Sequence, residues 1–547
     1  MTHTEEKFKM SALLESWYRL DRFAGQRWTI FLPGAMAALL RLVLLPWLPF
    51  PYPATHDEFS YLLGADTFSH WRLTNPAHPK WRFFETIHVI SIPTYASKYP
   101  PGQAFFLAIG ERLFGHPFFG SVLAFVFFVS AVVWMLRVWM PSGMALLAGF
   151  LTAIAFGTGN DWLESYWGGA VAAAGVALVL GAIGRIERQG RFIMAWPLAG
   201  GIILLWFTRP FEGAFFILAA GALLLFDVVR RRLPAGGDWS ASGLHSFITV
   251  LVLCGIGTVA FQAYYDFRVT GHLLLLPYSL HQQQYNYQPI FWFQHPTTPT
   301  LDTNPVVREF HQQWEFQAYQ ERRDLFMRRQ SLVLASEKAL TPPQLKERLK
   351  VMELIAAVVL ILVLSLLFRT DSAVRKLWFL LLISTIPLFL ETFTFAHYAI
   401  AVTITLIALI FRLIWLCHER RWPSSSTGTL LAALLISMLF CGAAGNNVFR
   451  VWRKVTEPFP LKVERSRVQR ELMARNGRQV LFVQYSPDHD TNLEWVYNGA
   501  DIDGSKLIWA RDLGPEQDKQ LIDYYPGRHF WILNADLQHP EPVPYEP

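Results

Sequence analysis

The stretch WTIFLPGAMAALLRLVLLPWLPF (residues 28–50) runs directly into PYPATHDEFSYLLGADTF (residues 51–68). The first part is apolar and long enough to cross the roughly 30 Å hydrocarbon core of a bilayer as a helix. The second part places His56, Asp57 and Glu58 side by side at the exit of that segment. Titratable groups this close to an apolar phase are costly, so their presence needs a structural or a chemical reason.

The composition of the chain indicates that this apolar segment is one of many. Of 547 residues, 52% are hydrophobic and 15% aromatic, while only 16% are charged. The mean hydropathy is +0.26. A soluble chain of this length would carry far more charge, so we predict a polytopic membrane protein. The three cysteines all lie in apolar segments and therefore indicate neither a disulfide framework nor a cysteine metal cluster.

About eleven apolar stretches are long enough to be membrane spans. The residues before the first stretch are mixed and charged, so we interpret that stretch as a retained signal anchor. The predicted spans lie near residues 29–50, 117–138, 142–159, 166–185, 192–208, 210–229, 246–266, 352–369, 376–391, 397–416 and 427–445.

Lysine and arginine in the short connections predict the orientation of these spans. The basic stretches are the N-terminal segment and residues 185–191, 230–232, 368–376 and 418–421, and all of them fall on one face. An excess of Lys and Arg marks the cytoplasmic side, so the N-terminus is predicted inside and the C-terminus outside. The basic loop 306–350 falls outside, but long loops are largely exempt from this rule. Cytoplasmic anchoring also accounts for the net charge of +6 without a nucleic-acid partner.

The remaining segments predict three domains. Residues 1–28 are cytoplasmic and include an amphipathic interfacial helix over 10–24. Residues 29–445 form an all-α transmembrane domain with two long outer loops, 51–116 and 271–350, which are too long to be simple connectors. Residues 446–547 form a small extracytoplasmic α/β domain, with strands in RQVLFVQYS (478–486), SKLIWARDL (505–513) and RHFWILNAD (528–536) separated by helical or turn-like stretches.

The titratable residues after the first span have a good local explanation. Thr55 and Glu58 match a capping box, and Asp57 falls in the first turn, where the helix dipole favours an acid. An apolar face follows, so we predict a helix over 56–69 on the outer surface. In isolation, this structural interpretation would be preferred to a catalytic one.

Further unusual polar residues are predicted on the same outer face. Lys98 precedes a proline pair in ASKYPPGQAFF (96–106), and Arg209 in TRPFEGA (208–214) has Glu212 as its expected ion-pair partner. Arg41 stands inside the first span, where an ionisable group is a functional candidate. Snorkelling and interface anchoring are the structural alternatives. Together, these groups suit a substrate with a lipid tail and an anionic phosphate. The other residues concerned are Glu85, Asp161, Glu164, His397 and Tyr398.

Three elements of the sequence resemble those of the GT-C glycosyltransferases. They are an arginine in the first span, Asp-Glu at the start of a long outer loop and a Lys-Tyr-Pro-Pro element before the second span. The resemblance covers roughly residues 28 to 445 and is strongest over 41–116. It is closest to the branch of the protein O-mannosyltransferases, the aminoarabinose transferases of lipid A and the lipopolysaccharide galacturonosyltransferase-like proteins. It implies a polyprenyl-phosphate sugar donor, an outward-facing site, inversion at the anomeric carbon and a location in the bacterial inner membrane facing the periplasm and cell envelope.

The resemblance also implies roles for particular residues. Asp57 matches the family's catalytic acid and Glu58 its neighbour, and we expect Asp57 to be the base that accepts the proton of the acceptor hydroxyl. Lys98 and Arg209 are expected to bind the donor phosphate, although Tyr99 separates Lys98 from the prolines, unlike in the family. The expected substrate-binding residues are His56, Tyr61, Glu85, Asp161, Glu164, His397 and Tyr398, where His397-Tyr398 resembles an outer His-Tyr element of the galacturonosyl-like proteins.

Cofactors and alternative functions follow from the same reasoning. No metal ligand is assigned and no cofactor is expected to be required, although some relatives use a divalent ion; the DID match at 501–503 lies in the C-terminal domain and is weak. The acceptor is a glycan, a lipid or a protein. Two alternatives stay open, a ligase for a lipid-linked polysaccharide and a non-catalytic transporter or flippase, although the latter would need charges along a path through the membrane.

Overall fold

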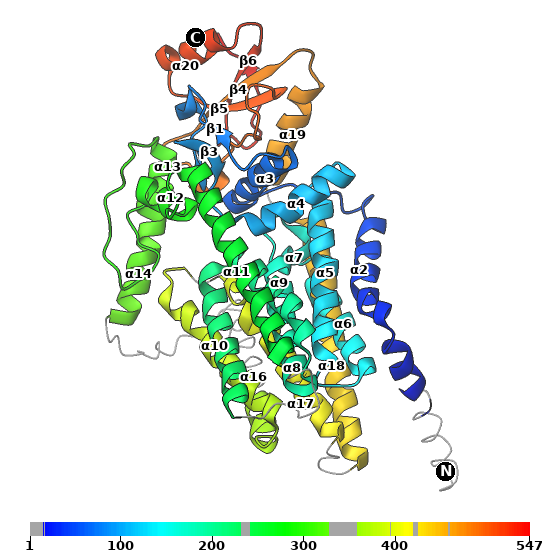
Figure 1. Cartoon of the computed structure of the whole chain (residues 1–547). Coiled ribbons are helices and arrows are strands. Elements are labelled where there is room, and N and C mark those ends of the chain that lie inside the picture. The colour runs from blue at the N-terminus through cyan, green and yellow to red at the C-terminus, as the bar shows by residue number, and fades with distance from the viewer. Residues whose placement is uncertain are drawn as a thin grey trace, which may run out of the picture.

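The computed structural model describes residues 15, 17–230, 241–327, 358–393, 395–419, 425–457 and 460–546. A bundle of helices forms one part of the molecule, and an α/β domain covers one end of that bundle (Figure 1). The first described residues and the C-terminal α/β domain lie at opposite ends of the molecule. The chain is therefore a polytopic helical membrane protein with a C-terminal α/β domain, as the sequence predicts.

Seven of the described helices are long and apolar enough to cross a membrane. Each one overlaps a span predicted from the sequence, and α11 and α18 extend well beyond the predicted limits. The seven helices are α5 (Phe118–Leu136), α8 (Ala170–Gln189), α10 (Pro210–Val229), α11 (Ala241–Thr270), α16 (Ser372–Leu390), α17 (Ile400–Glu419) and α18 (Ser425–Thr456). Three further predicted spans coincide with shorter apolar helices, which are α6 (Ser142–Phe156), η3 with α9 (Phe192–Met194 and Ala195–Trp206), and the described part of 352–369, Val358–Leu367.

The first predicted span, 29–50, is not one continuous helix. The chain is helical over residues 17–24, forms the 3₁₀ turn η1 (Arg27–Phe31) and continues as α2 (Leu32–Val43). Pro46 and Pro49 follow shortly after α2 and cannot donate the backbone hydrogen bonds that would extend it. The predicted length of this span is therefore wrong. Residues 10–14 and 16 of the predicted interfacial helix lie outside the described residues.

Small residues bring two helices of the bundle close together. A Cβ atom on Gly175 of α8 would lie 3.0 Å from the carbonyl oxygen of Gly201 in α9. A side chain at this position would force the two backbones apart. The small-residue run that ends at Gly175 thus provides the close helix approach expected of such residues in membranes.

The first outer loop is folded rather than extended. Its helix α3 (His56–Ser69) has the predicted limits and is followed by a short antiparallel sheet and by α4 (Pro101–Phe114). The strands pair in the order β1-β3-β2. Their bounds are β1 (Asn75–Pro76), β2 (Val89–Ile90) and β3 (Thr94–Ser97), with the 3₁₀ turn η2 (Trp81–Phe83) between the first two.

The described part of the second outer loop packs beside the first one. It contains short helices and a single π-helical turn, and it ends at residue 327. Residues 328–350 of this predicted loop lie outside the described residues. The elements are α12 (Pro277–Tyr285), α13 (Pro305–Glu309), η4 (Phe310–Trp314) and α14 (Glu315–Met327).

The C-terminal domain follows α18 and has the predicted α/β character. Its sheet has the order β5-β4-β6-β7, in which β4 runs parallel to both of its neighbours and β7 is antiparallel. All three predicted strands and the intervening helix are present. The elements are α19 (Pro460–Ala474), β4 (Gln479–Gln484), η6 (Thr491–Leu493), β5 (Leu507–Arg511), α20 (Pro515–Tyr524), β6 (His529–Asn534) and β7 (Val543–Pro544).

The C-terminal domain shares a hydrophobic core with the first outer loop. Phe59 of α3 stacks on Tyr497 with ring centroids 4.1 Å apart, within a cluster that also includes residues of β4 and β5. Arg511 of β5 donates to the backbone carbonyl of Glu85 over 2.9 Å. The backbone N–H of Ala500 donates to Asp66 of α3 over 2.7 Å. The domain therefore holds α3 in place from above (Figure 1).

Candidate active site

The N-terminus of α3 is fixed by Glu58. One carboxylate oxygen accepts hydrogen bonds from the backbone N–H groups of Ala54 (2.8 Å) and Thr55 (3.3 Å). The other accepts from the N–H of Tyr166, which lies between α7 (Asp161–Glu164) and α8, over 3.2 Å. This is the predicted capping box with one additional long-range bond. Three backbone donors occupy the Glu58 carboxylate, so its arrangement suits helix positioning better than proton transfer.

Asp57 is held differently from its neighbour. Its Oδ1 atom accepts a hydrogen bond from His88 Nδ1 (2.8 Å) and a second, short one from the Tyr99 hydroxyl. Its side chain retains 25% exposure. Burial alone would raise the pKa of Asp57, but these two hydrogen bonds and the charges of His88 and Lys98 hold the pKa well below its usual range. Asp57 is therefore anionic, oriented and still accessible.

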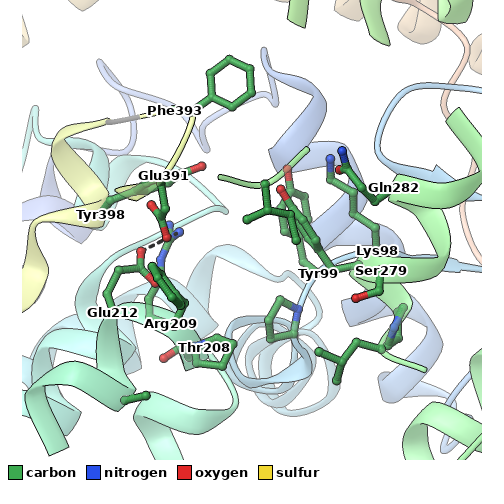
Figure 2. A pocket seen from close by; sticks show the side chains of 18 of the residues that line it. Lys98, Tyr99, Thr208, Arg209, Glu212, Ser279, Gln282, Glu391, Phe393 and Tyr398 are labelled. Carbon is green, nitrogen blue, oxygen red and sulfur yellow. Dashed lines mark ion pairs between the residues drawn. The ribbon is translucent and has the colours of Figure 1, made fainter. Parts of the chain in front are cut away.

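A cavity of about 440 Å³ opens beside Tyr99. Lys98 and Tyr99 lie on one wall and Arg209 with Tyr398 on the opposite wall, as Figure 2 shows. Its volume is within the range of small-molecule sites. The apolar part of the lining comes from Pro100, Pro101, Phe211, Leu276, Ile290 and Phe291. Glu212, Glu315 and Glu391 also line the cavity. Its apolar lining and the cations on two facing walls suit an amphiphilic molecule with an anionic head.

Lys98 is a buried cation without a direct ion pair among the described residues. It is 5% exposed, and its ammonium lies 5.3 Å from the ring centroid of Tyr99 and 5.2 Å from that of Tyr278. Burial lowers the pKa of Lys98 to about 8, against the opposing charges of Glu315 and Asp57. The cation–π contacts and the nearby carboxylates keep the lysine charged at neutral pH.

Arg209 lies at the start of α10, and its guanidinium is 3.8 Å from Glu212 and 4.6 Å from the ring centroid of Tyr398. The Arg209–Glu212 pair predicted from the sequence is confirmed. Burial alone would lower the pKa of Arg209, but the Glu212 charge and nearby tyrosines raise it above its usual value.

His397 packs on Trp167 with ring centroids 4.4 Å apart, and burial lowers its pKa to about 3. His397 is therefore neutral and presents no charge to an anion.

Three sequence candidates are engaged in structural contacts. Glu164 forms a bidentate ion pair with Arg41 at 2.5 and 3.0 Å, and both are buried. Glu85 is buried and accepts from the backbone and side-chain N–H groups of Asn304. Asp161 is largely exposed and lies 3.4 Å from Lys454 of α18. These contacts explain the three carboxylates, and Arg41, without a substrate.

The two remaining candidates flank Asp57. His56 is buried, and its Nδ1 lies 2.8 Å from the hydroxyl of Tyr497 in the C-terminal domain. Tyr61 lines the cavity and stacks on Tyr99 with ring centroids 4.7 Å apart. The structure thus brings together Asp57, Lys98 and Arg209 with three of the predicted substrate-binding residues, namely Tyr61, His397 and Tyr398.

The structure adds residues that the sequence analysis missed. His88 contacts Asp57 directly, and its backbone has a positive φ of 63°, which is uncommon for a histidine. Glu315 lines the cavity from α14 and accepts hydrogen bonds from Asn286 (2.5 Å), Gln288 (2.7 Å) and His311 (2.6 Å). No local spacing links these residues to Asp57, because His88 lies 31 positions away in the first outer loop and Glu315 comes from the second outer loop.

Potential metal ligands occur in the same region. His88, His311 and Glu315 are buried, and one ligand atom of each lies within 4.8 Å of the others. In the DID match, by contrast, Asp503 accepts hydrogen bonds from His78 and Tyr525, while Asp501 accepts from the backbone of Gly504. The DID stretch is therefore explained by local structure.

No protein-family model matches the chain, and no curated protein matches its sequence. Two crystal structures of the oligosaccharyltransferase from Archaeoglobus fulgidus match the chain at low identity. The apo form is 13% identical, with a TM-score of 0.44, over 84% of this chain and 62% of that enzyme. The form with zinc and sulfate is 14% identical, with a TM-score of 0.40, over 92% of this chain and 67% of that enzyme. The chain spans about two thirds of the length of this enzyme.

Proposed function

We propose that the chain is a GT-C-type glycosyltransferase that moves a sugar from a polyprenyl-phosphate donor to an acceptor hydroxyl at the outer face of the membrane. The observation that carries the proposal is the position of Asp57, an oriented carboxylate one hydrogen bond away from Tyr99 in the wall of an apolar cavity with two cations. The resemblance of the first outer loop to the GT-C enzymes supports the same assignment.

The cavity suits the donor because each part of that molecule has a matching surface. The apolar lining accepts the first isoprene units. Lys98 and Arg209, on opposite walls, can bind the phosphate through charge-assisted hydrogen bonds (Figure 2). The same charges stabilise the polyprenyl phosphate as it leaves, so the reaction needs no general acid.

Asp57 acts as the base in this proposal. It accepts the proton of the acceptor hydroxyl while the oxygen attacks the anomeric carbon from the face opposite the phosphate, which inverts the configuration. A weak base suffices, because the hydroxyl becomes acidic as it bonds to an oxocarbenium-like carbon. Donor phosphate also offsets the Lys98 charge, which is one of the causes of the low pKa of Asp57.

The other residues position this base. His88 and Tyr99 hold the Oδ1 atom of Asp57, and Glu58 fixes the helix start. The C-terminal domain holds α3 through Phe59 and Tyr497. We assign Tyr61 and Tyr398 to sugar or phosphate contacts, because both line the cavity. In the proposed orientation, the N-terminus is cytoplasmic and the cavity faces the periplasm.

A defined reaction in liposomes tests the proposal and separates it from the two alternatives. Purified protein is reconstituted with a polyprenyl-phosphate-linked monosaccharide and a mixture of glycan, lipid and peptide acceptors. The proposal expects release of polyprenyl phosphate together with a product one sugar longer. Products that carry a polymer from a lipid-linked polysaccharide would instead identify a ligase. Donor movement between leaflets with no product would identify a flippase.

A further inference from the structure

Glu391 is a buried acid in the cavity wall that the proposed mechanism does not use. It directly follows α16, lines the cavity and is 8% exposed. Its Oε2 atom has no hydrogen-bond partner among the described residues. Burial and the neighbouring Glu212 charge raise the pKa of Glu391 to about 8. Such a group is costly to the fold, because buried polar atoms are nearly always hydrogen-bonded.

The second outer loop holds the backbone of Glu391 in place. Glu391 forms an antiparallel bridge with Phe291. The backbone N–H of Thr392 donates to the carbonyl of Ile290 over 2.9 Å, and the Thr392 hydroxyl donates to the carbonyl of Pro289 over 3.0 Å. A side chain on a backbone fixed in this way is positioned for a ligand before the ligand binds.

The charges of the cavity limit which ligand group can lie against Glu391. Glu212 and Glu391 lie beside Arg209, on the wall opposite Lys98 (Figure 2). With Glu315, the described lining residues include three carboxyl groups and two cations. The donor phosphate adds negative charge and takes both cations. A further anion would therefore enter an apolar cavity without a cation of its own, which is unfavourable.

One part of the proposed donor can donate a hydrogen bond to Glu391. The polyprenyl tail is apolar, and a phosphate esterified on both sides offers acceptor oxygens without a donor. The sugar, in contrast, carries hydroxyl groups that donate. A carboxyl group accepts such hydrogen bonds in its ionised form and keeps acceptor capacity when it is protonated. The sugar is therefore the matching partner for Glu391.

We propose that Glu391 selects the donor sugar by accepting a hydrogen bond from one of its hydroxyl groups, and that the site rejects sugars that carry a carboxylate. The inference rests on the proposed function and adds the class of sugar, a neutral sugar rather than a uronic acid. His397-Tyr398 resembles an element of the galacturonosyl-like proteins, but the acidic wall of the cavity disfavours an acidic sugar. Glu391 is thus a specificity-determining residue and takes no part in proton transfer.

Donor binding is the direct test. The full chain in lipid nanodiscs is titrated with matched pairs of polyprenyl-phosphate sugars that differ only at the C6 carbon, namely glucose and glucuronic acid, galactose and galacturonic acid, and mannose and mannuronic acid. In each pair that binds, the neutral sugar should bind at least about 10-fold more tightly than the uronic acid. Glu391→Gln keeps the shape of the side chain but offers an N–H donor to a carboxylate, so it should bring this ratio close to one.

Glu85→Gln is the matched control and should leave the ratio unchanged. Glu85 is also buried, has a raised pKa and has an oxygen without a partner, but it is not among the described residues that line the cavity.

The outcomes separate this inference from the proposed function. Equal or tighter binding of the uronic acids by the unaltered protein overturns the inference, even where sugar transfer is observed. An unchanged ratio in Glu391→Gln, with folding checked by thermal unfolding, also overturns it. Binding with the expected preference but without transfer contradicts the proposed function alone. If no member of any pair binds, both are contradicted.

Discussion

Replacement of Lys98 by methionine should stabilise the protein and weaken donor binding at the same time. Burial lowers the pKa of Lys98 from 10.5 to about 8. The unfolded chain therefore binds the Lys98 proton more tightly than the folded chain does. Because Lys98 is protonated in both states at pH 7, this difference lowers the free energy of unfolding in full at that pH. A shift of roughly 2.5 pKa units corresponds to about 3 kcal/mol. Methionine fills a similar volume without the charge, so Lys98→Met should raise the free energy of unfolding by up to that amount.

The buried Lys98 charge lowers the stability of the folded protein, and we expect the same charge to bind the donor phosphate. Loss of one charge-assisted hydrogen bond to phosphate should weaken donor affinity by about 10- to 100-fold. Thermal unfolding in detergent at pH 7 and pH 10, with donor binding measured on the same samples, checks both effects. The stability difference should shrink at pH 10, where Lys98 is neutral in the folded unaltered protein. As a control, Lys376→Met should be destabilising, because Lys376 pairs with Glu187 (2.7 Å) and Asp227. A destabilised Lys98→Met protein with unchanged donor affinity would refute the assignment.

Three further predictions address pH, packing and orientation. Donor affinity should fall as pH rises through about 8, since Lys98 loses its proton there in the free protein, and binding measured at pH 7 and pH 9 checks this. Arg41→Met should cost about 3–5 kcal/mol in unfolding measurements, because it leaves Glu164 buried without its ion pair, while the folded fraction should still bind donor. A reporter fused after residue 547 should be active outside the cell and one inserted within 185–191 active inside; the reverse result would contradict the proposed orientation.

Sequence alone predicts those elements whose causes are local. The start of α3 follows from its capping box, and the strands of the C-terminal domain follow from short apolar runs between turns. The first span was predicted too long because overall hydropathy outweighed the helix-ending effect of Pro46 and Pro49. Hydropathy indicates which segments are apolar, but it does not show where the helix in such a segment ends.

Long-range contacts distinguish candidate site residues that the sequence alone could not tell apart. Asp57 and Glu58 are adjacent in sequence, yet Glu58 is occupied by backbone donors that include Tyr166, and Asp57 is oriented by His88 and Tyr99. Arg41 and Glu164 each look functional alone, because their pairing across 123 positions cannot be read from either segment. His88 and Glu315 were missed for the same reason, since they come from two loops with no common spacing.

Sugar transfer by the purified Asp57→Asn protein tests the central proposal most directly. Asparagine keeps the size of the side chain but cannot accept the proton, so the rate should fall by at least about 10² to 10⁴ while the protein remains folded and binds donor. Glu58→Gln is the matched neighbour. It should lose about 0.5–2 kcal/mol of stability through the weakened cap but retain transfer once folded. A near-normal rate for Asp57→Asn would contradict the account, and inactivity of a folded Glu58→Gln protein would move the base to Glu58.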